Sequence, residues 1–327
     1  MKIKQSIHNL RKVFFAGITI MILAICTFAQ RQTNEVVTTG KEVTILVTAV
    51  PQNERAREIA AKLQPNDFIV TEEKQKQQIL SVKRAREAPM SIAVVLQDDL
   101  VSHVNNEIQC IKDFIRQLPE GTRVMTAYIT AGSLRVTQEF TADRGRAADS
   151  MRIIAGSPNV SSYSPYIEIT DALQRFEGQP PGRHIMLLVS DGLDLSSGYR
   201  YASPSFSLYL DQAVNEAQRR GVVIFPFFAP SSRSFRWDRF AINYGQGSLN
   251  RLADETGGEA FFSGWDFVTF DPYFRELNEL LDRQWLITYR SSNTGKGFRR
   301  IEVTTDFDLH LHHPAGYRAQ DEKPPKK

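Results

Sequence analysis

Two apolar runs in this chain end in acidic residues, and these carboxylates are its clearest candidates for chemistry. Ile185–Val189 leads through a serine to Asp191, and Ser91–Gln97 leads to Asp98 and Asp99. An unbroken apolar run suits a strand buried on both faces, as in the middle of a parallel sheet. Parallel strands end at one edge, where open α/β sheets bind ligands. Carboxylates and hydroxyls gathered there would form an oxygen-rich site for a hard cation.

The same residues also have a structural explanation. Asp98 and Ser102 could cap the helix that follows, because side-chain oxygens accept bonds from free backbone N–H groups and acids suit the helix dipole. Asp191 would then only shape its turn. An enzymatic alternative is a hydrolase that uses Asp98, Asp99 and Asp191 around a metal. The sequence contains no Gly-x-Ser-x-Gly elbow, His-Glu-x-x-His pair or phosphate loop to support it.

The elements around these runs predict an α/β domain from residue 89 to residue 283. Strand patterns alternate with helix patterns there, which is typical of a mostly parallel sheet with helices on both faces. Ala131 and Gly132 turn one strand back as an antiparallel hairpin. The expected strands are Ser91–Gln97, Arg123–Thr130, Leu134–Phe140, Ile185–Val189, Val222–Phe228 and Glu259–Phe262. The expected helices are Ser102–Leu118, Asp143–Ile154, Tyr166–Phe176, Leu208–Arg219, Leu249–Thr256 and Pro272–Asp282.

Two β-rich segments flank this domain, residues 43–88 before it and residues 284–318 after it. We expect them to pack together as a small sandwich, although the sequence leaves open whether they form one domain. Glu54–Lys62 fits a helix or part of a strand–loop–strand module. The expected strands are Val43–Val50, Asn66–Val70, Gln78–Lys83, Trp285–Arg290, Phe298–Thr305 and Asp308–His312.

The first 29 residues have the pattern of a signal peptide, with a basic start, an apolar run and small residues before a cleavage point. The alternative is an uncleaved N-terminal membrane anchor. Removing this segment, which holds four basic residues and no acid, changes the formal net charge from +3 to −1. A near-neutral mature chain argues against nucleic-acid binding. We expect an exported protein, periplasmic or extracellular, with a linker at 30–42, a disordered tail at 319–327 and no membrane span in the mature chain.

Three parts of the chain resemble a known family: Lys62–Val70 with Gln77–Ile79, Leu187–Asp194, and Gln284–Arg290 with Pro314–Tyr317. In this order and spacing they resemble the von Willebrand factor A domain, and more narrowly the VWFA-related family of exported bacterial proteins. The resemblance covers residues 43 to 317, nearly the whole mature chain. It implies a Rossmann-like A domain with a mostly parallel six-stranded sheet and helices on both faces.

Such A domains hold one divalent cation through an Asp-x-Ser-x-Ser turn, a distant Thr and a late Asp, and Asp191 matches the late Asp. The turn departs from this pattern in both possible registers, which place Gln97, Asp99 and Val101, or Asp98, Leu100 and Ser102, at its three positions. The distant Thr has no counterpart, and Ser162 and Ser164 lie in the corresponding loop. The candidate ligands of Mg²⁺ or Mn²⁺ are therefore Asp98, Asp99, Ser102, Ser164 and Asp191.

Two long loops, at 195–206 and 230–247, are expected to leave the same edge of the sheet. They carry arginine and aromatic residues, which are enriched where proteins bind one another. The alternative is that these side chains fold back and cover the sheet. The candidate partner-binding residues are Tyr199, Arg200, Tyr201, Phe235, Arg236, Trp237 and Arg239.

These observations favour an exported, non-enzymatic, adhesion-type binding module with a degenerate cation site and a protein partner. Two alternatives stay open. One is the metal-dependent hydrolase, and the other is a structural interaction module whose metal site is silent.

Overall fold

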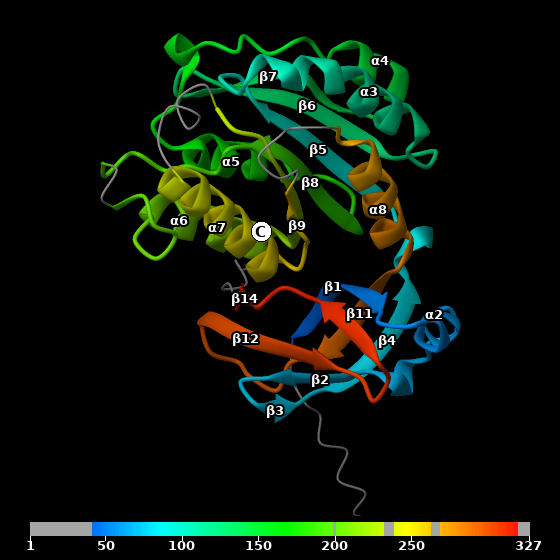
Figure 1. Ribbon diagram of the computed structural model, residues 1–327. Helices are drawn as coiled ribbons and strands as arrows, with labels where there is room; N and C mark the ends of the chain where they lie inside the picture. Colours follow the sequence, from blue (N-terminus) through cyan, green and yellow to red (C-terminus); the bar gives the residue numbers. More distant parts are fainter. Residues whose placement is uncertain (1–40, 199–200, 232–238, 263–268, 320–327) are drawn as a thin grey trace, which may run out of the picture. The chain divides into compact units, whose positions relative to one another are not determined.

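The computed structural model describes residues 41–198, 201–231, 239–262 and 269–319 (Figure 1). The expected signal peptide, almost all of the linker and the end of the tail lie outside the described residues. Residues 40–327 form one compact unit. No helix in the described part is both long enough and apolar enough to cross a membrane.

A six-stranded sheet forms the centre of the α/β part, in the order β10-β9-β8-β5-β6-β7. All neighbouring strands are parallel except β6 and β7, which form the expected antiparallel hairpin. The strands are β5 (Met90–Gln97), β6 (Arg123–Thr130), β7 (Ser133–Thr141), β8 (Arg183–Ser190), β9 (Val222–Phe228) and β10 (Phe261–Phe262). Every residue of β5 and β9 is buried, as their apolar sequences predict.

The strand order reverses between β5 and β8. From β5 the chain adds β6 and β7 on one side, and it then returns to add β8, β9 and β10 on the other. Leu96 of β5 lies opposite Val189 of β8 in parallel register, so the residues after each strand emerge together at the carboxyl edge. Such a reversal point is where open α/β sheets bind their ligands.

Helices cover both faces of this sheet (Figure 1). One apolar core joins the sheet to α3, α4 and α8, and a second joins it to α5, α6 and α7. The helices are α3 (Ile108–Gln117), α4 (Arg144–Asp149), α5 (Pro165–Gln174), α6 (Leu208–Arg220), α7 (Arg239–Thr256) and α8 (Asp271–Asp282). Two-sided coverage explains why the central strands carry continuous apolar runs.

The two flanking β segments share both sheets of a sandwich. One sheet has the order β13-β1-β11-β4 and the other β14-β12-β2-β3, and side chains from both enter one apolar core. The strands are β1 (Glu42–Pro51), β2 (Ile69–Glu72), β3 (Gln75–Lys76), β4 (Gln78–Arg84), β11 (Gln284–Arg290), β12 (Gly297–Thr304), β13 (Leu309–His312) and β14 (Gly316–Ala319). Strands from the two ends of the described chain therefore pair directly, β1 with β11 and β2 with β12.

Several element boundaries differ from the sequence predictions. The expected helix at 102–118 begins with a 3-10 turn, Ser102–Glu107, and only then becomes α-helical. The expected helix at 143–154 ends early, at Asp149. Residues 54–60 form a helix, α2 (Glu54–Ala60), capped by the Asn53 side chain, which settles that open alternative.

The largest difference concerns α7, which begins at Arg239 and therefore includes residues that were expected to form a loop. Gly245 was placed in the expected loop at 230–247, but it lies inside the helix. A Cβ atom at this position would lie 2.0 Å from the carbonyl oxygen of Asp191. The glycine thus lets α7 approach the carboxyl edge closely, a requirement that no local pattern reveals.

Candidate functional site at the carboxyl edge of the sheet

The ends of β5 and β8 place a group of buried polar side chains at the reversal point. Gln97, Asp98 and Asp99 follow one strand, and Ser190 and Asp191 end the other. Asp99 and Ser190 are fully buried, and the other three are almost so. The sequence prediction that the two acidic strand ends meet at one edge is confirmed by the register of the sheet.

Gln97 connects the two strand ends through its amide. Its Nε2 donates to Asp99 Oδ1 at 2.7 Å, and its Oε1 accepts from Ser190 Oγ at 2.6 Å and from the Asp191 backbone N–H at 3.2 Å. The residue in the first position of the expected cation-binding turn is therefore a neutral amide. It donates a hydrogen bond to Asp99 and carries no negative charge that could help to hold a cation.

Asp98 is turned away from this group and forms an ion pair. Both Arg152 Nη atoms lie 2.8 Å from its two oxygens, and the Ala155 N–H donates to it at 2.9 Å. The guanidinium also stacks on Tyr128, 4.0 Å from the ring centroid. Burial acts to raise the pKa of Asp98, but the bonds from Arg152 and Ala155 outweigh it and lower the pKa. Asp98 does not cap the following helix, so that alternative is wrong for it.

Asp191 lies in a different electrostatic environment. Burial, followed by the charge of Asp99, raises the pKa of Asp191 to about 6, although hydrogen bonds from Ser231 and the Leu193 N–H act to lower it. No cation of the described residues pairs with Asp99 or Asp191. The bond to Leu193 shapes the turn after β8, as expected, but the two carboxylates also form a buried pair of like charges.

The two predicted serine ligands occupy contrasting positions. Ser102 is exposed at the start of its 3-10 turn and makes no capping bond there, so its capping alternative is wrong as well. Ser164 is fully buried at the start of α5, and its Oγ has no hydrogen-bond partner. Hydrogen bonds before and after Ser164 in the chain hold its loop against the site. Ser161 donates to Asp99, and Tyr166 Oη donates to the Gly192 carbonyl at 2.7 Å.

Two residues of this site could not be identified from the sequence pattern. Arg152 lies 54 positions after its partner Asp98, and Ser161 sits in a run of polar residues where any member could have been chosen. Asp194, a second carboxylate after β8, is bonded to Ser196 and Ser207 and holds the start of α6. It is therefore explained by local structure.

Large exposed apolar side chains gather around this edge. They belong to the loops and first helical turns that leave the carboxyl ends of the strands or cross beside them, and Phe298 of the sandwich is the exception among the described residues. We call this surface the edge patch, and its members are Ile153, Tyr163, Ile167, Tyr201, Phe206, Leu208 and Phe240.

The predicted partner-binding residues lie only partly within the described chain. Tyr201 is 57% exposed in the edge patch, and Arg239 is exposed as the first residue of α7. Tyr199, Arg200, Phe235, Arg236 and Trp237 lie outside the described residues. The expected loop at 230–247 is shorter than predicted, since α7 takes up its second half.

The candidate ligands suit a divalent cation only in part. No group of three or more His, Cys, Asp or Glu side chains in the described part of the chain is arranged to hold one. Asp98 has both oxygens bonded to Arg152, and Ser102 is exposed. Asp99 and Asp191 remain as a buried anionic pair, which is the part of the predicted ligand set that suits a divalent cation by charge.

No family model and no curated protein matches this sequence. Solved structures that are similar include BatB from Bacteroides thetaiotaomicron, at 14% identity over 59% of this chain and 98% of that one, with a TM-score of 0.43. An aerotolerance-related membrane protein from Bacteroides fragilis, with multiple mutations to serine, is 12% identical over 59% and 99%, with a TM-score of 0.43. Manganese-loaded TRAP from Plasmodium vivax is 8% identical over 76% and 97%, with a TM-score of 0.40.

The architecture of the central sheet decides the fold. It has six strands, a single antiparallel edge strand and helices on both faces, with the order reversing at β5 and β8. The α/β part has a von Willebrand A-like fold. The polar group described above lies at the carboxyl edge of this A-like domain, where the resemblance placed its ligands.

Proposed function

We propose that this protein is an exported, non-enzymatic binding module that holds a protein partner at the carboxyl edge of its A-like domain. The edge patch is the observation that carries the proposal. Nearly all large exposed apolar side chains of the described residues gather there, around buried polar groups. Export is supported by the signal-like sequence of residues 1–29.

The composition of the edge patch suits a protein interface. Tyr163 is 73% exposed and Phe206 is 68% exposed, so both would lose water contact on binding. Arg152 borders the patch with its side chain 43% exposed while it remains paired with Asp98. Aromatic side chains and arginines contribute most of the energy in many protein interfaces. Exposed apolar side chains that gather in one region of a surface mark interaction sites in many proteins.

The test compares the edge patch with the exposed apolar residue of the sandwich. The double variant Tyr201→Ser/Phe206→Ser removes two patch side chains, and Phe298→Ser is the matched control. Proteins crosslinked to the full chain in its native extracellular fraction are identified by mass spectrometry, and the recovered partner is then titrated against each purified variant. Binding weakened at least about tenfold by the double variant alone supports the proposal. Equal binding by all three proteins refutes it.

A divalent cation forms the second part of the proposal. Asp99 and Asp191 are the residues that would hold Mg²⁺ or Mn²⁺, because two buried carboxylates without a cationic neighbour are stabilised by a positive ion between them. Such an ion would bind weakly, since Gln97 supplies an amide where a third charge is expected. It would supply an open coordination position for an acidic group of the partner.

Calorimetric titration with MgCl₂ and MnCl₂ tests this second part. The expected result is weak binding to the intact protein and none to Asp191→Asn, with the Asp194→Asn variant as a control that removes a carboxylate outside the pair. Absence of heat and of any thermal stabilisation in the intact protein would refute the cation site. It would leave the edge-patch proposal standing, because that rests on apolar contacts.

The non-enzymatic part of the proposal follows from the state of the acidic residues. A hydrolase of the predicted kind needs Asp98, Asp99 and Asp191 around one metal, whereas Asp98 is bonded to Arg152 through both oxygens. A screen of the purified protein with Mn²⁺ against peptide, ester and phosphoester substrates checks this. Turnover that disappears in Asp191→Asn would establish the hydrolase instead.

A further inference from the structure

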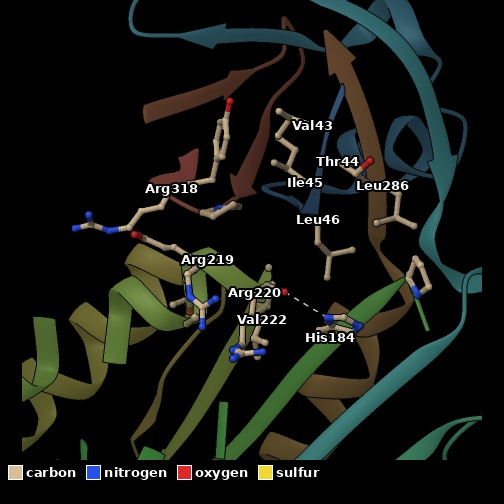
Figure 2. A pocket seen from close by; sticks show the side chains of 18 of the residues that line it. Val43, Thr44, Ile45, Leu46, His184, Arg219, Arg220, Val222, Leu286 and Arg318 are labelled. Atoms are coloured by element: carbon tan, nitrogen blue, oxygen red, sulfur yellow. Dashed lines mark hydrogen bonds between the residues drawn. The ribbon is translucent and has the colours of Figure 1, made fainter. Parts of the chain in front are cut away.

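A pocket of about 560 Å³ lies at the opposite end of the central sheet from the candidate site (Figure 2). It is lined by β1 of the sandwich, by the first residues of β9 together with His184 near the start of β8, by the end of α6 and by β14. The volume falls in the range of small-molecule sites, which occur preferentially where two structural parts meet. Nothing in the edge-patch proposal accounts for this pocket.

One part of the pocket wall is apolar. Leu46 of β1, Leu286 of β11 and Val222 of β9 line it (Figure 2), whereas the side chains of Val43 and Ile45, on the other face of β1, belong to the sandwich core. Consecutive residues of one strand point to opposite faces, so β1 contributes both to the sandwich core and to the pocket. This wall offers contact to an alkyl or other apolar body.

The other part of the wall is basic. Arg219, Arg220 and Arg318 line it together with Lys41, while Glu42 is the acidic residue of the lining. Arg219 and Arg220 end α6, where positive charge complements the helix dipole. Arg318 lies on β14, so the dipole of α6 does not explain its position.

The charges of these arginines are only partly balanced. Arg219 Nε and Arg220 Nε both bond to the single carboxylate of Glu216, at 2.8 and 2.5 Å, and Arg220 also lies 3.4 Å from the exposed Glu177. Arg318 donates its Nε and Nη2 to the neutral Asn215 Oδ1, at 3.1 and 2.9 Å. No carboxylate of the described residues pairs with Arg318. Its guanidinium is therefore oriented by a side-chain amide while its charge stays available.

We propose that this pocket binds an amphipathic anion, with an alkyl chain against β1 and β11 and a carboxylate or phosphate head on Arg318 and Arg219. A guanidinium suits both head groups, since its parallel N–H donors match two oxygens of either. Inorganic phosphate would leave the apolar wall without a contact, and a neutral alcohol or a cationic amphiphile would leave the arginines without an anion. We therefore expect only a molecule with both features to bind.

The test uses four probes that share one chain, each below its micelle concentration or, for the alcohol, below its solubility limit. Dodecanoate and dodecyl phosphate carry the anionic heads, dodecanol is neutral and dodecyltrimethylammonium is cationic. Calorimetry on the full mature chain should give binding for at least one anionic probe, and the stronger of the two identifies the head group. It should give none for the other two probes or for acetate and inorganic phosphate alone.

Two variants locate the site. Arg318→Gln should weaken the anionic probe about tenfold or more, as expected for loss of charge-assisted bonds. Arg300→Gln is the matched control, because Arg300 is exposed on β12 opposite Gly316 and is not part of the pocket. It should change binding less than twofold, as should Tyr201→Ser/Phe206→Ser in the edge patch.

Three results would overturn the proposal. They are no binding of either anionic probe, equally strong binding of dodecanol, and equal weakening by Arg318→Gln and Arg300→Gln. Far-ultraviolet circular dichroism and melting temperature confirm beforehand that both variants fold. Failure of the edge-patch variants to lose their protein partner has no bearing on this pocket.

Discussion

Glu72 in the sandwich and Asp191 in the A-like domain are both buried carboxylates, but a positive charge acts on the first and a negative charge acts on the second. Glu72 is fully buried and accepts hydrogen bonds from Tyr289, Ser291, Asn293, Arg299 and Tyr317. Asp191 is as deeply buried, but the charge that acts on its pKa is the negative charge of Asp99.

The two pKa shifts follow from this difference. Burial acts to raise the pKa of Glu72, but the bonds from Asn293, Ser291 and Tyr289 and the Arg299 guanidinium outweigh it, so the pKa is lowered. In Asp191 burial and Asp99 act together, and the pKa rises to about 6. A buried carboxylate with its own cation serves the fold. One buried beside a second carboxylate costs stability, an arrangement that is enriched at functional sites.

Removing the cation from the sandwich carboxylate should have the largest effect. Arg299→Gln leaves Glu72 charged, buried and without its ion pair, which should lower the free energy of unfolding by about 3–5 kcal/mol. Urea unfolding at pH 7.5 measures it, with the exposed Arg300→Gln as the control. A loss below about 1 kcal/mol would show that the neutral donors around Glu72 suffice by themselves.

Neutralising the carboxylate in the A-like domain should have the opposite sign. Because the pKa of Asp191 rises from its ordinary 3.8 to about 6 in the folded protein, Asp191→Asn should stabilise the metal-free protein at pH 7.5 by up to about 3 kcal/mol. Urea unfolding in the presence of EDTA measures this, and Glu72→Gln should destabilise under the same conditions. A less stable Asp191→Asn would mean that the pair is already neutralised.

The pH dependence of this gain checks its origin. The folded pKa of Asp191 lies above the unfolded one, so the folded state binds the proton more tightly. The penalty is complete above about pH 6 and disappears as the pH falls toward 3.8. The advantage of Asp191→Asn should therefore shrink between pH 7 and pH 4 in unfolding experiments. A constant difference across this range would exclude titration as the cause.

Breaking the ion pair of the neighbouring Asp98 should have an intermediate effect. Arg152→Gln leaves Asp98 buried with its charge uncompensated, but the Arg152 side chain is 43% exposed and water screens part of the loss. We expect a destabilisation of about 1–3 kcal/mol in urea unfolding. The effect should fade at acidic pH, because a lowered pKa contributes stability that is lost as the carboxylate is protonated.

The smallest effect should come from two serines that differ only in their partners. Ser164 Oγ is buried without a hydrogen bond, so Ser164→Ala should be neutral or stabilise by about 1 kcal/mol. Ser291 donates to Glu72 at 2.8 Å, so Ser291→Ala should cost about 1 kcal/mol. Thermal unfolding of the two variants side by side measures the difference. Equal losses would indicate that Ser164 has a partner in solution.

The sequence predicted much of the fold because its central strands are locally encoded. The observed bounds of β6 and β9 are those expected, and β5 and β8 differ by one or two residues at their ends. Helix α7 was predicted to start ten residues too late, at Leu249, which left Gly245 in the preceding loop. Only the packed structure shows that this glycine allows α7 to pass close to Asp191.

The meeting of the two acidic strand ends at one edge was predicted, but the surroundings of the five candidate ligands were not. Asp99 and Asp191 are both buried. Asp98 forms an ion pair with Arg152, Ser102 is exposed, and the Oγ of Ser164 is buried without a hydrogen bond. The ion pair of Asp98 depends on Arg152, a residue distant in sequence, which neither periodicity nor motif spacing can supply.

The amino-acid sequence by itself determined where the acidic residues emerge. Strands that are apolar on both faces belong in the middle of a covered parallel sheet, and parallel strands end at one edge. Only the tertiary structure decided the charge state of each carboxylate, because that depends on which distant side chain lies within bonding distance. Arg152 reaches Asp98 and no cation of the described residues reaches Asp191, so neighbouring acids at one edge acquire opposite properties.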